Sequence, residues 1–179
     1  MVGGPCLSGA EVGKVPTYML SNREFSALVD KGTYPEQVAV PIDPPFANQN
    51  GEIFNLLLER FTSVALIRSV AGAVRANHFH QTDWHYTFVQ WGAVEYYWRP
   101  QGSKATPSHQ TFPAGTMFFT PPLVDHAMFF PSDTVVFTFA KNIRDQEHHE
   151  ADVVRLPLIA VKRDASAPGG WQVSFPDSQ

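Results

Sequence analysis

Four histidines in the middle of the chain have the residue type and spacing that could bind a metal ion. His78 and His80 lie two residues apart, so both imidazoles project from the same face if this stretch is a β-strand. His85 begins an apolar run that predicts the returning strand, and His126 comes from a later predicted strand. Imidazoles that converge from separate strands are suited to a divalent transition metal. We therefore predict that these four histidines are metal ligands.

Two motifs enclose these histidines. The first consists of Gly72, five residues, His78-Phe79-His80, four residues, His85, six residues and Gly92. The second consists of Gly115, five residues, Pro121-Pro122-Leu123, two residues and His126. Their order and spacing resemble the two motifs of the cupin superfamily, in particular its RmlC-like members. The resemblance covers roughly residues 60 to 140.

The chain departs from the cupin pattern at three positions. His85 stands where the family usually has a glutamate ligand, while Leu123 and Phe130 replace the usual glycine and asparagine. The resemblance implies an all-β fold, the cupin-type double-stranded β-helix (a jelly-roll barrel), with a bound metal. It also implies a homodimer and either dioxygenase or isomerase/epimerase activity. The reaction stays open, because cupins host many chemistries on one scaffold.

His85 has two possible roles at this site. It is either the fourth metal ligand or a catalytic group that transfers protons without touching the metal. Asp83 could supply a carboxylate instead, although it falls in the predicted turn. A set of neutral imidazoles suits Fe, Ni, Mn, Cu or Zn, whereas Mg²⁺ and Ca²⁺ prefer oxygen ligands. Such a centre should attract a small, oxygen-rich metabolite.

Strand parity indicates which other side chains enter the pocket. Trp91 shares the parity of His85, and Met128 and Phe130 share that of His126, so we expect these three to line an apolar substrate pocket. Arg75 and Asn77 have the opposite parity to His78 and should lie outside the barrel. The remaining histidines lie in polar stretches and are expected to be solvated: His109, His148 and His149.

The chain divides into three predicted parts. Residues 1–45 form an N-terminal arm with a short helix from about Asn22 to Asp30 and an edge strand near residues 37–42. Residues 46–165 form a single barrel domain of short strands separated by frequent turns. Within it, the polar residues 141–151 are expected to form a surface loop before one last strand, residues 153–161. Residues 166–179 are a C-terminal tail.

Composition restricts the partners and the compartment. The 179 residues carry a formal net charge of −4 and have no basic run, which argues against nucleic acid as a partner. The lone Cys6 permits no disulfide within the chain. The first residues lack the pattern of a secretory signal, and no stretch has the length of a membrane span. The sequence therefore predicts a soluble, cytoplasmic protein.

Three functions follow from these observations. The first is a metal-binding cupin enzyme that acts on a small oxygen-rich metabolite by dioxygenation or by metal-assisted isomerisation or epimerisation. The second is an enzyme that resembles the metal-free deoxysugar epimerases and uses one essential histidine. The third is a non-catalytic cupin that binds or senses a small molecule.

Overall fold

The computed structural model describes residues 34–176. The expected helix at residues 22–30 and the lone cysteine lie outside this range. Within the described residues, β-strands predominate, and α2 (Gln146–Asp152) is a short helix near the end of the chain. The helices of this range are all too short or too polar to span a lipid bilayer.

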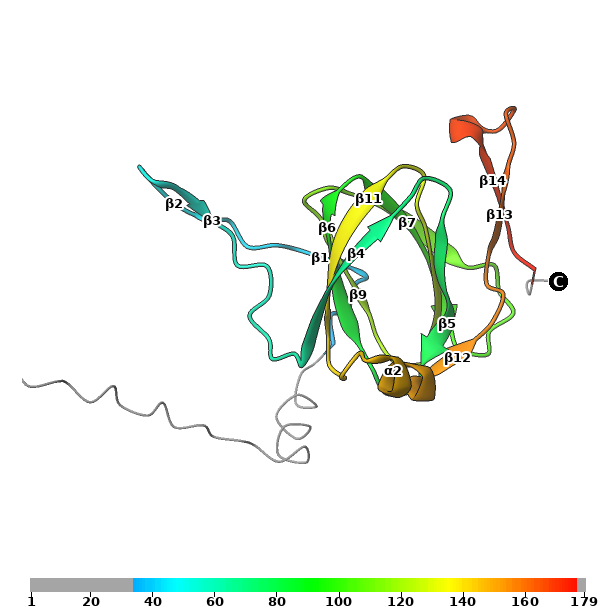
Figure 1. The fold of residues 1–179 in the computed structure, drawn as a ribbon, viewed down its shortest axis with the longest axis horizontal. Helices are drawn as coiled ribbons and strands as arrows, with labels where there is room; N and C mark the ends of the chain where they lie inside the picture. The colour runs from blue at the N-terminus through cyan, green and yellow to red at the C-terminus, as the bar shows by residue number, and fades with distance from the viewer. Residues whose placement is uncertain (1–33, 177–179) are drawn as a thin grey trace, which may run out of the picture. The chain divides into compact units, whose positions relative to one another are not determined.

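Two antiparallel sheets of five strands each form the barrel of the described residues. The first sheet has the order β1, β9, β6, β11, β4: β1 (Ala39–Val40), β9 (Met117–Thr120), β6 (His85–Trp91), β11 (Thr134–Ala140) and β4 (Ser63–Ser69). The second has the order β12, β5, β10, β7, β8: β12 (Val153–Arg155), β5 (Val74–His80), β10 (Val124–Phe129), β7 (Ala93–Pro100) and β8 (Ser108–Pro113). The two sheets face each other around an interior, with α2 at one end next to β12 (Figure 1). The predicted jelly-roll barrel is confirmed.

The interior forms because alternate residues of the strands point inward. Strand β11 shows this clearly, since buried residues alternate along it with half-buried ones. The inward side chains make one apolar cluster: Val89, Val94, Tyr96, Phe112, Phe118, Met128, Phe130 and Val136. Burying a side chain such as Phe118 contributes about 2 kcal/mol to folding. Beside this apolar cluster the fold buries several polar side chains, among them His80, His85 and His126.

A second apolar layer covers the outer face of the sheet that contains β5, β10 and β7. Leu158 and Ile159 pack there against Tyr97, Ala127 and Phe129. The chain then continues through β13 (Ala160–Arg163), a 3₁₀ turn η1 (Pro168–Gly170) and β14 (Trp171–Ser174), and β13 pairs with β14 as a hairpin. A separate hairpin, β2 (Phe46–Asn48) with β3 (Gly51–Ile53), lies in the chain between the barrel strands β1 and β4.

Several elements differ from the sequence-based boundaries. The expected edge strand is β1, and it joins the barrel sheet although it falls in the segment assigned to the arm. The single strand expected at residues 153–161 is two strands, β12 and β13. Strand β14 lies within the expected C-terminal tail. The polar residues 141–151, expected to be a loop, contain most of α2 because Asp145 caps its N-terminus and accepts a hydrogen bond from the His148 backbone.

Gly92, between β6 and β7, has a backbone that only glycine adopts without strain. Its φ is +79°, and a Cβ there would lie 2.4 Å from the Asp133 carbonyl oxygen. Gly92→Ala is therefore expected to lower the free energy of unfolding by on the order of 3 kcal/mol, from backbone strain and steric overlap together. Urea unfolding measures this. Gly102→Ala is the matched control, because Gly102 has the same φ with no described atom within 4 Å of the added Cβ. A loss of equal size in both variants would contradict the steric argument.

Candidate metal centre

Strands β5 and β10 bring three of the predicted histidines to one point. His78 pairs with His126 across the two strands, and His80 lies on the same face of β5. One ring nitrogen from each residue lies within 4.8 Å of the others. The ring centroids are 4.7 Å apart for His78 and His126, and 4.8 Å apart for His78 and His80. These three residues make up the three-histidine group.

A β-bulge aims this group into the barrel. Ala76 and Asn77 have left-handed φ values of 64° and 54°, and the β5–β10 register shifts at this point. Asn77 is the extra residue, and its side chain donates a hydrogen bond to the Ile159 carbonyl at 3.0 Å and accepts one from the Ile159 N–H at 3.0 Å. The bulge thus turns Asn77 away from the interior and fixes the direction of the histidines that follow.

Hydrogen bonds assign the protons on two of the imidazoles. His80 donates from Nδ1 to Asp152 Oδ2 at 3.0 Å, and His126 donates from Nδ1 to the Val124 carbonyl at 3.0 Å. Each neutral ring therefore keeps an unprotonated Nε2. Among the described residues, nothing donates a hydrogen bond to the buried His126 Nε2. An unpaired buried acceptor costs about 1–3 kcal/mol, so this atom is suited to a ligand that takes up its lone pair.

The imidazoles of the cluster are neutral at physiological pH. Burial lowers the pKa of His78 and that of His80 to about 2, with the neighbouring imidazoles and Arg144 as further causes. Burial also lowers the pKa of His126 to about 4 and holds that of His85 well below its usual value. Neutral imidazoles are the form that binds a metal ion.

A second group shares His80 with the first and contains His85 and Asp83. One ligand atom from each of these residues also lies within 4.8 Å of the others. The Arg144 guanidinium contacts all three, because Nη2 lies 3.2 Å from His80 Nε2 and 3.1 Å from His85 Nδ1, and Nε donates to Asp83 Oδ2 at 3.2 Å. Burial raises the pKa of Asp83, and the Arg144 charge opposes that shift. We call these four residues the arginine group.

The four histidines predicted as ligands therefore lie together, but not as one symmetrical set. The ring of His85 is 5.3 Å from that of His80 and 5.6 Å from that of His126. Its Nδ1 faces Arg144, and its carboxylate neighbour Asp83 is buried against the same guanidinium. Whether His85 is a ligand or a proton-transfer group stays a prediction.

Sequence reasoning missed three side chains from the segment around α2. Arg144 contacts two of the histidines, and Asp152 accepts hydrogen bonds from His80, Thr82 and the Asp83 backbone. His149, expected to be solvated, is half-buried with its ring 5.6 Å from that of His80. Asp145 was the available signal, because a capping residue before a polar run favours a helix.

The predicted pocket residues have different positions. Met128 and Phe130 lie in the interior apolar cluster, on the strand and turn that follow His126. Trp91 is 65% exposed, so it does not enter the interior. A register shift between β6 and β11 leaves Gln90 unpaired and reverses the alternation after Val89, which is why parity misplaced Trp91.

Four peripheral residues lie on the outside, as expected. Asn77 faces the C-terminal segment, as its parity predicted. Arg75 is exposed. It pairs with Met128 across β5 and β10, and its guanidinium donates a hydrogen bond to Ser69 Oγ at 2.8 Å. His148 and His109 are exposed, as expected, and His109 stacks on Tyr97.

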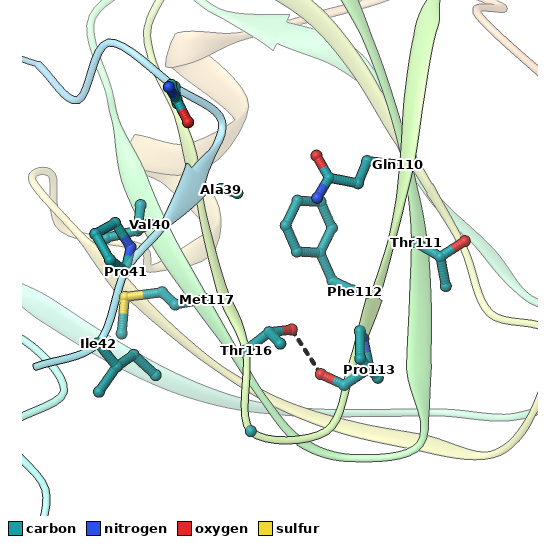
Figure 2. Close-up of a pocket in the computed structure, with 12 residues that line it drawn as sticks. Ala39, Val40, Pro41, Ile42, Gln110, Thr111, Phe112, Pro113, Thr116 and Met117 are labelled. Atoms are coloured by element: carbon teal, nitrogen blue, oxygen red, sulfur yellow. Dashed lines mark hydrogen bonds between the residues drawn. The ribbon is translucent and has the colours of Figure 1, made fainter. Parts of the chain in front are cut away.

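An open groove of 570 Å³ lies elsewhere on the barrel, between the edge strands β1 and β8 (Figure 2). Its lining residues are Gln37, Ala39, Val40, Pro41, Ile42, Gln110, Thr111, Phe112, Pro113, Gly115, Thr116 and Met117. This lining, all within the described part of the chain, contains no acid, base or thiol. The groove therefore lacks side chains for acid–base chemistry. The histidine cluster has such side chains, so it is the better candidate for the functional site.

Comparison with known proteins shows the fold. No protein-family model matches the chain, and no curated protein matches its sequence. Among solved structures, it is similar to the sugar 3,4-ketoisomerase QdtA from Thermoanaerobacterium thermosaccharolyticum in complex with TDP, with a TM-score of 0.53, 17% identity, and coverage of 68% of this chain and 90% of that one. It is also similar to a 3,4-ketoisomerase from Helicobacter canadensis, with a TM-score of 0.51, 11% identity, and coverage of 63% and 85%. Because the sequence identities are low, this likeness supports the fold alone, which is that of the RmlC-like cupins.

Proposed function

We propose that this protein is a metal-dependent cupin enzyme that isomerises or epimerises a small oxygen-rich substrate by moving a proton next to a carbonyl group. The observation that carries the proposal is the buried, unpaired Nε2 of His126, which belongs to the three-histidine group. A divalent ion would use that lone pair, together with those of His78 and His80.

The residues present fit such an ion. The three imidazoles are neutral, and their ligand atoms converge. Two of the rings are fixed from behind, by the Asp152 carboxylate and by the Val124 carbonyl, as is typical of metal-binding histidines. The imidazole set favours Fe, Ni, Mn, Cu or Zn. When bound, the ion would act as a Lewis acid that stabilises negative charge on a substrate oxygen.

His85 is the residue that we propose for proton transfer. It is 3% exposed, its ring lies beside the three-histidine group, and its Nδ1 lone pair accepts a hydrogen bond from Arg144. Burial keeps its pKa low, so the ring is neutral, and it can accept a proton at Nδ1 once the Arg144 N–H has moved off that lone pair. The burial of His85 keeps bulk water away from that proton.

The substrate class is suggested by the structural neighbours. QdtA is described in complex with TDP and, in another structure, with TDP-4-keto-6-deoxyglucose. We therefore propose keto sugars, with or without an attached nucleotide, as the first substrates to test. Dioxygenation of a small metabolite is the other reaction that this donor set can support.

A second candidate function has its own support in the structure. The hydrogen bond from His80 Nδ1 to Asp152 orients the ring by a carboxylate, and His80 Nε2 becomes a base when the Arg144 N–H that it accepts moves away, an arrangement that works without metal. In this alternative, the protein is a metal-free isomerase or epimerase with His80 as its essential base.

Two measurements distinguish these functions. Protein purified without added metal is analysed for bound elements, and keto sugars are incubated with it in D₂O while oxygen uptake is followed. Stoichiometric transition metal with deuterium incorporation next to the carbonyl supports the proposal. Incorporation without metal supports the metal-free alternative, and oxygen uptake without incorporation supports dioxygenation. Bound metal without either reaction points to a binding or sensor protein.

Asp152→Asn is expected to weaken metal binding by about 10–100-fold. The carboxylate accepts hydrogen bonds from His80 Nδ1, from the backbone N–H groups of Thr82 and Asp83, and from the Thr82 hydroxyl. An asparagine cannot satisfy all of these donors, so the His80 ring loses its fixed orientation. Competition with a chromogenic chelator measures the affinity. Asp145→Asn is the control, because it removes an exposed charge from the same segment and keeps a good helix cap. An equal loss of metal affinity in both variants would show that the charge of the segment, and not the orientation of the His80 ring, determines metal binding.

A further inference from the structure

Arg144 occupies the lone pair of a histidine that the proposed metal site requires. Its Nη2 lies 3.2 Å from His80 Nε2, and its side chain is only 16% exposed. His80 Nδ1 already donates to Asp152, so Nε2 is the one unprotonated nitrogen of that ring. One lone pair cannot accept an N–H and bind a metal ion at the same time. Arg144 and the ion therefore exclude each other at His80.

When Arg144 leaves His80, two partners remain within its reach: His85 Nδ1, which lies 3.1 Å from Nη2, and the Asp83 carboxylate. The Arg144 Nε donates to Asp83 Oδ2 at 3.2 Å, and Asp83 is 2% exposed. Asp83 Oδ1 accepts the Asn142 backbone N–H at 2.8 Å, so this carboxylate is held independently of the guanidinium. The guanidinium can therefore release His80 and stay tethered beside the site through Asp83.

The charges of the site then favour a negative ligand. Among the described residues, the charged groups that are hydrogen-bonded to the histidines or to each other here are Arg144, Asp83 and Asp152. A divalent ion added to one guanidinium and two carboxylates leaves one positive charge uncompensated. A buried charge of this kind is stabilised by an opposite charge that forms hydrogen bonds.

We propose that Arg144 is the anion-binding residue of this site: a metal ion displaces it from His80 Nε2, and its freed N–H groups then bind an anionic oxygen of the substrate, such as a carboxylate or an enolate. The inference rests on the metal site proposed above. It adds a substrate feature, an anionic oxygen within reach of both the metal position and Arg144. A guanidinium is suited to this task because its planar donors match a carboxylate.

The test uses Co²⁺ as the probe ion and acetate as the probe anion. Chelator competition measures the Co²⁺ affinity of the metal-free protein, and the visible spectrum of the Co²⁺ protein follows acetate binding. Arg144→Gln is expected to bind Co²⁺ about 10-fold more tightly than the wild type, because nothing competes for His80. The Co²⁺ form of this variant is expected to bind acetate at least about 10-fold more weakly. A merely structural role would weaken both affinities together.

Two further variants make the result decisive. Arg144→Gln leaves Asp83 buried without its partner, so the double variant Arg144→Gln/Asp83→Asn repeats the test with the pair neutralised. Arg155→Gln removes a nearby exposed cation, paired with Glu150, and should change either affinity less than twofold. Unchanged or weaker Co²⁺ binding in both Arg144 variants overturns the inference while the metal site stands, and so does unchanged acetate binding. A wild type that binds no Co²⁺ overturns the metal site as well.

Discussion

His126→Ala is expected to weaken the binding of a divalent transition metal by on the order of 100-fold or more. The substitution removes the only imidazole of the cluster whose Nε2 is buried without a partner among the described residues. It also leaves His78 and His80 as a pair, which cannot surround an ion. The measurement is metal content by elemental analysis, together with Ni²⁺ titration of the metal-free protein.

The control for this prediction is another histidine. His109→Ala changes an exposed residue of β8 that stacks on Tyr97, outside the cluster. Its metal content should equal that of the wild type. Stoichiometric metal in the His126→Ala protein would remove the main support for the three-histidine group and would favour the metal-free reading built on His80 and Asp152.

The metal-free protein is expected to lose several kcal/mol of stability as the pH falls from 7 to 4. An unfolded histidine takes up a proton near pH 6.5, whereas folded His126 has a pKa of about 4. The unfolded state therefore binds more protons in this window, so the contribution is complete above pH 6.5 and is lost as the pH falls. Each such histidine costs about 1.4 kcal/mol per pH unit, or about 3 kcal/mol by pH 4 for His126 alone. His78 and His80 act in the same direction.

Urea unfolding at pH 7, 6 and 5 tests this prediction. The free energy of unfolding should fall with each step, and His126→Gln should flatten the slope by about 1.4 kcal/mol per pH unit. A stability that does not change between pH 7 and pH 5 would show that the imidazoles are not held neutral by burial. A bound metal should delay the loss, because protons and the ion compete for the same nitrogens.

The sequence was sufficient for the features that are local. The spacing of His78 and His80, the glycine-bounded motif around them and the later His126 carried the resemblance to cupins, and that resemblance implied the barrel in which these rings converge. Strand alternation placed His78 and His80 on one face of β5, because alternation is a short-range property. Alternation failed where the sheet is irregular. The shift after Val89 turned Trp91 outward, and no residue type at Gln90 marks that position.

The long-range part of the site could not be predicted in the same way. Arg144 lies 64 residues after His80, and Asp152 lies 72 residues after it. Both come from a polar run whose composition also fits a solvated loop. Only the course of the chain, from β11 through α2 into β12, brings these charges to the barrel end. Residue types alone contain no such information.

The bulge in β5 sets the orientation of His78 and His80, and it is held by hydrogen bonds from a later segment of the chain, Leu156 to Ile159. We call these hydrogen bonds the brace. The Asn77 amide is held on both sides by the backbone of Ile159, and the Leu156 N–H donates to the Asn77 carbonyl. A protein shortened before Leu156 would retain every histidine of the cluster and still lose this brace. Ala76 and Asn77 would then be free to relax from their left-handed backbone conformation toward a regular strand. Any truncated form of this barrel intended to keep its chemistry must therefore extend past Ile159.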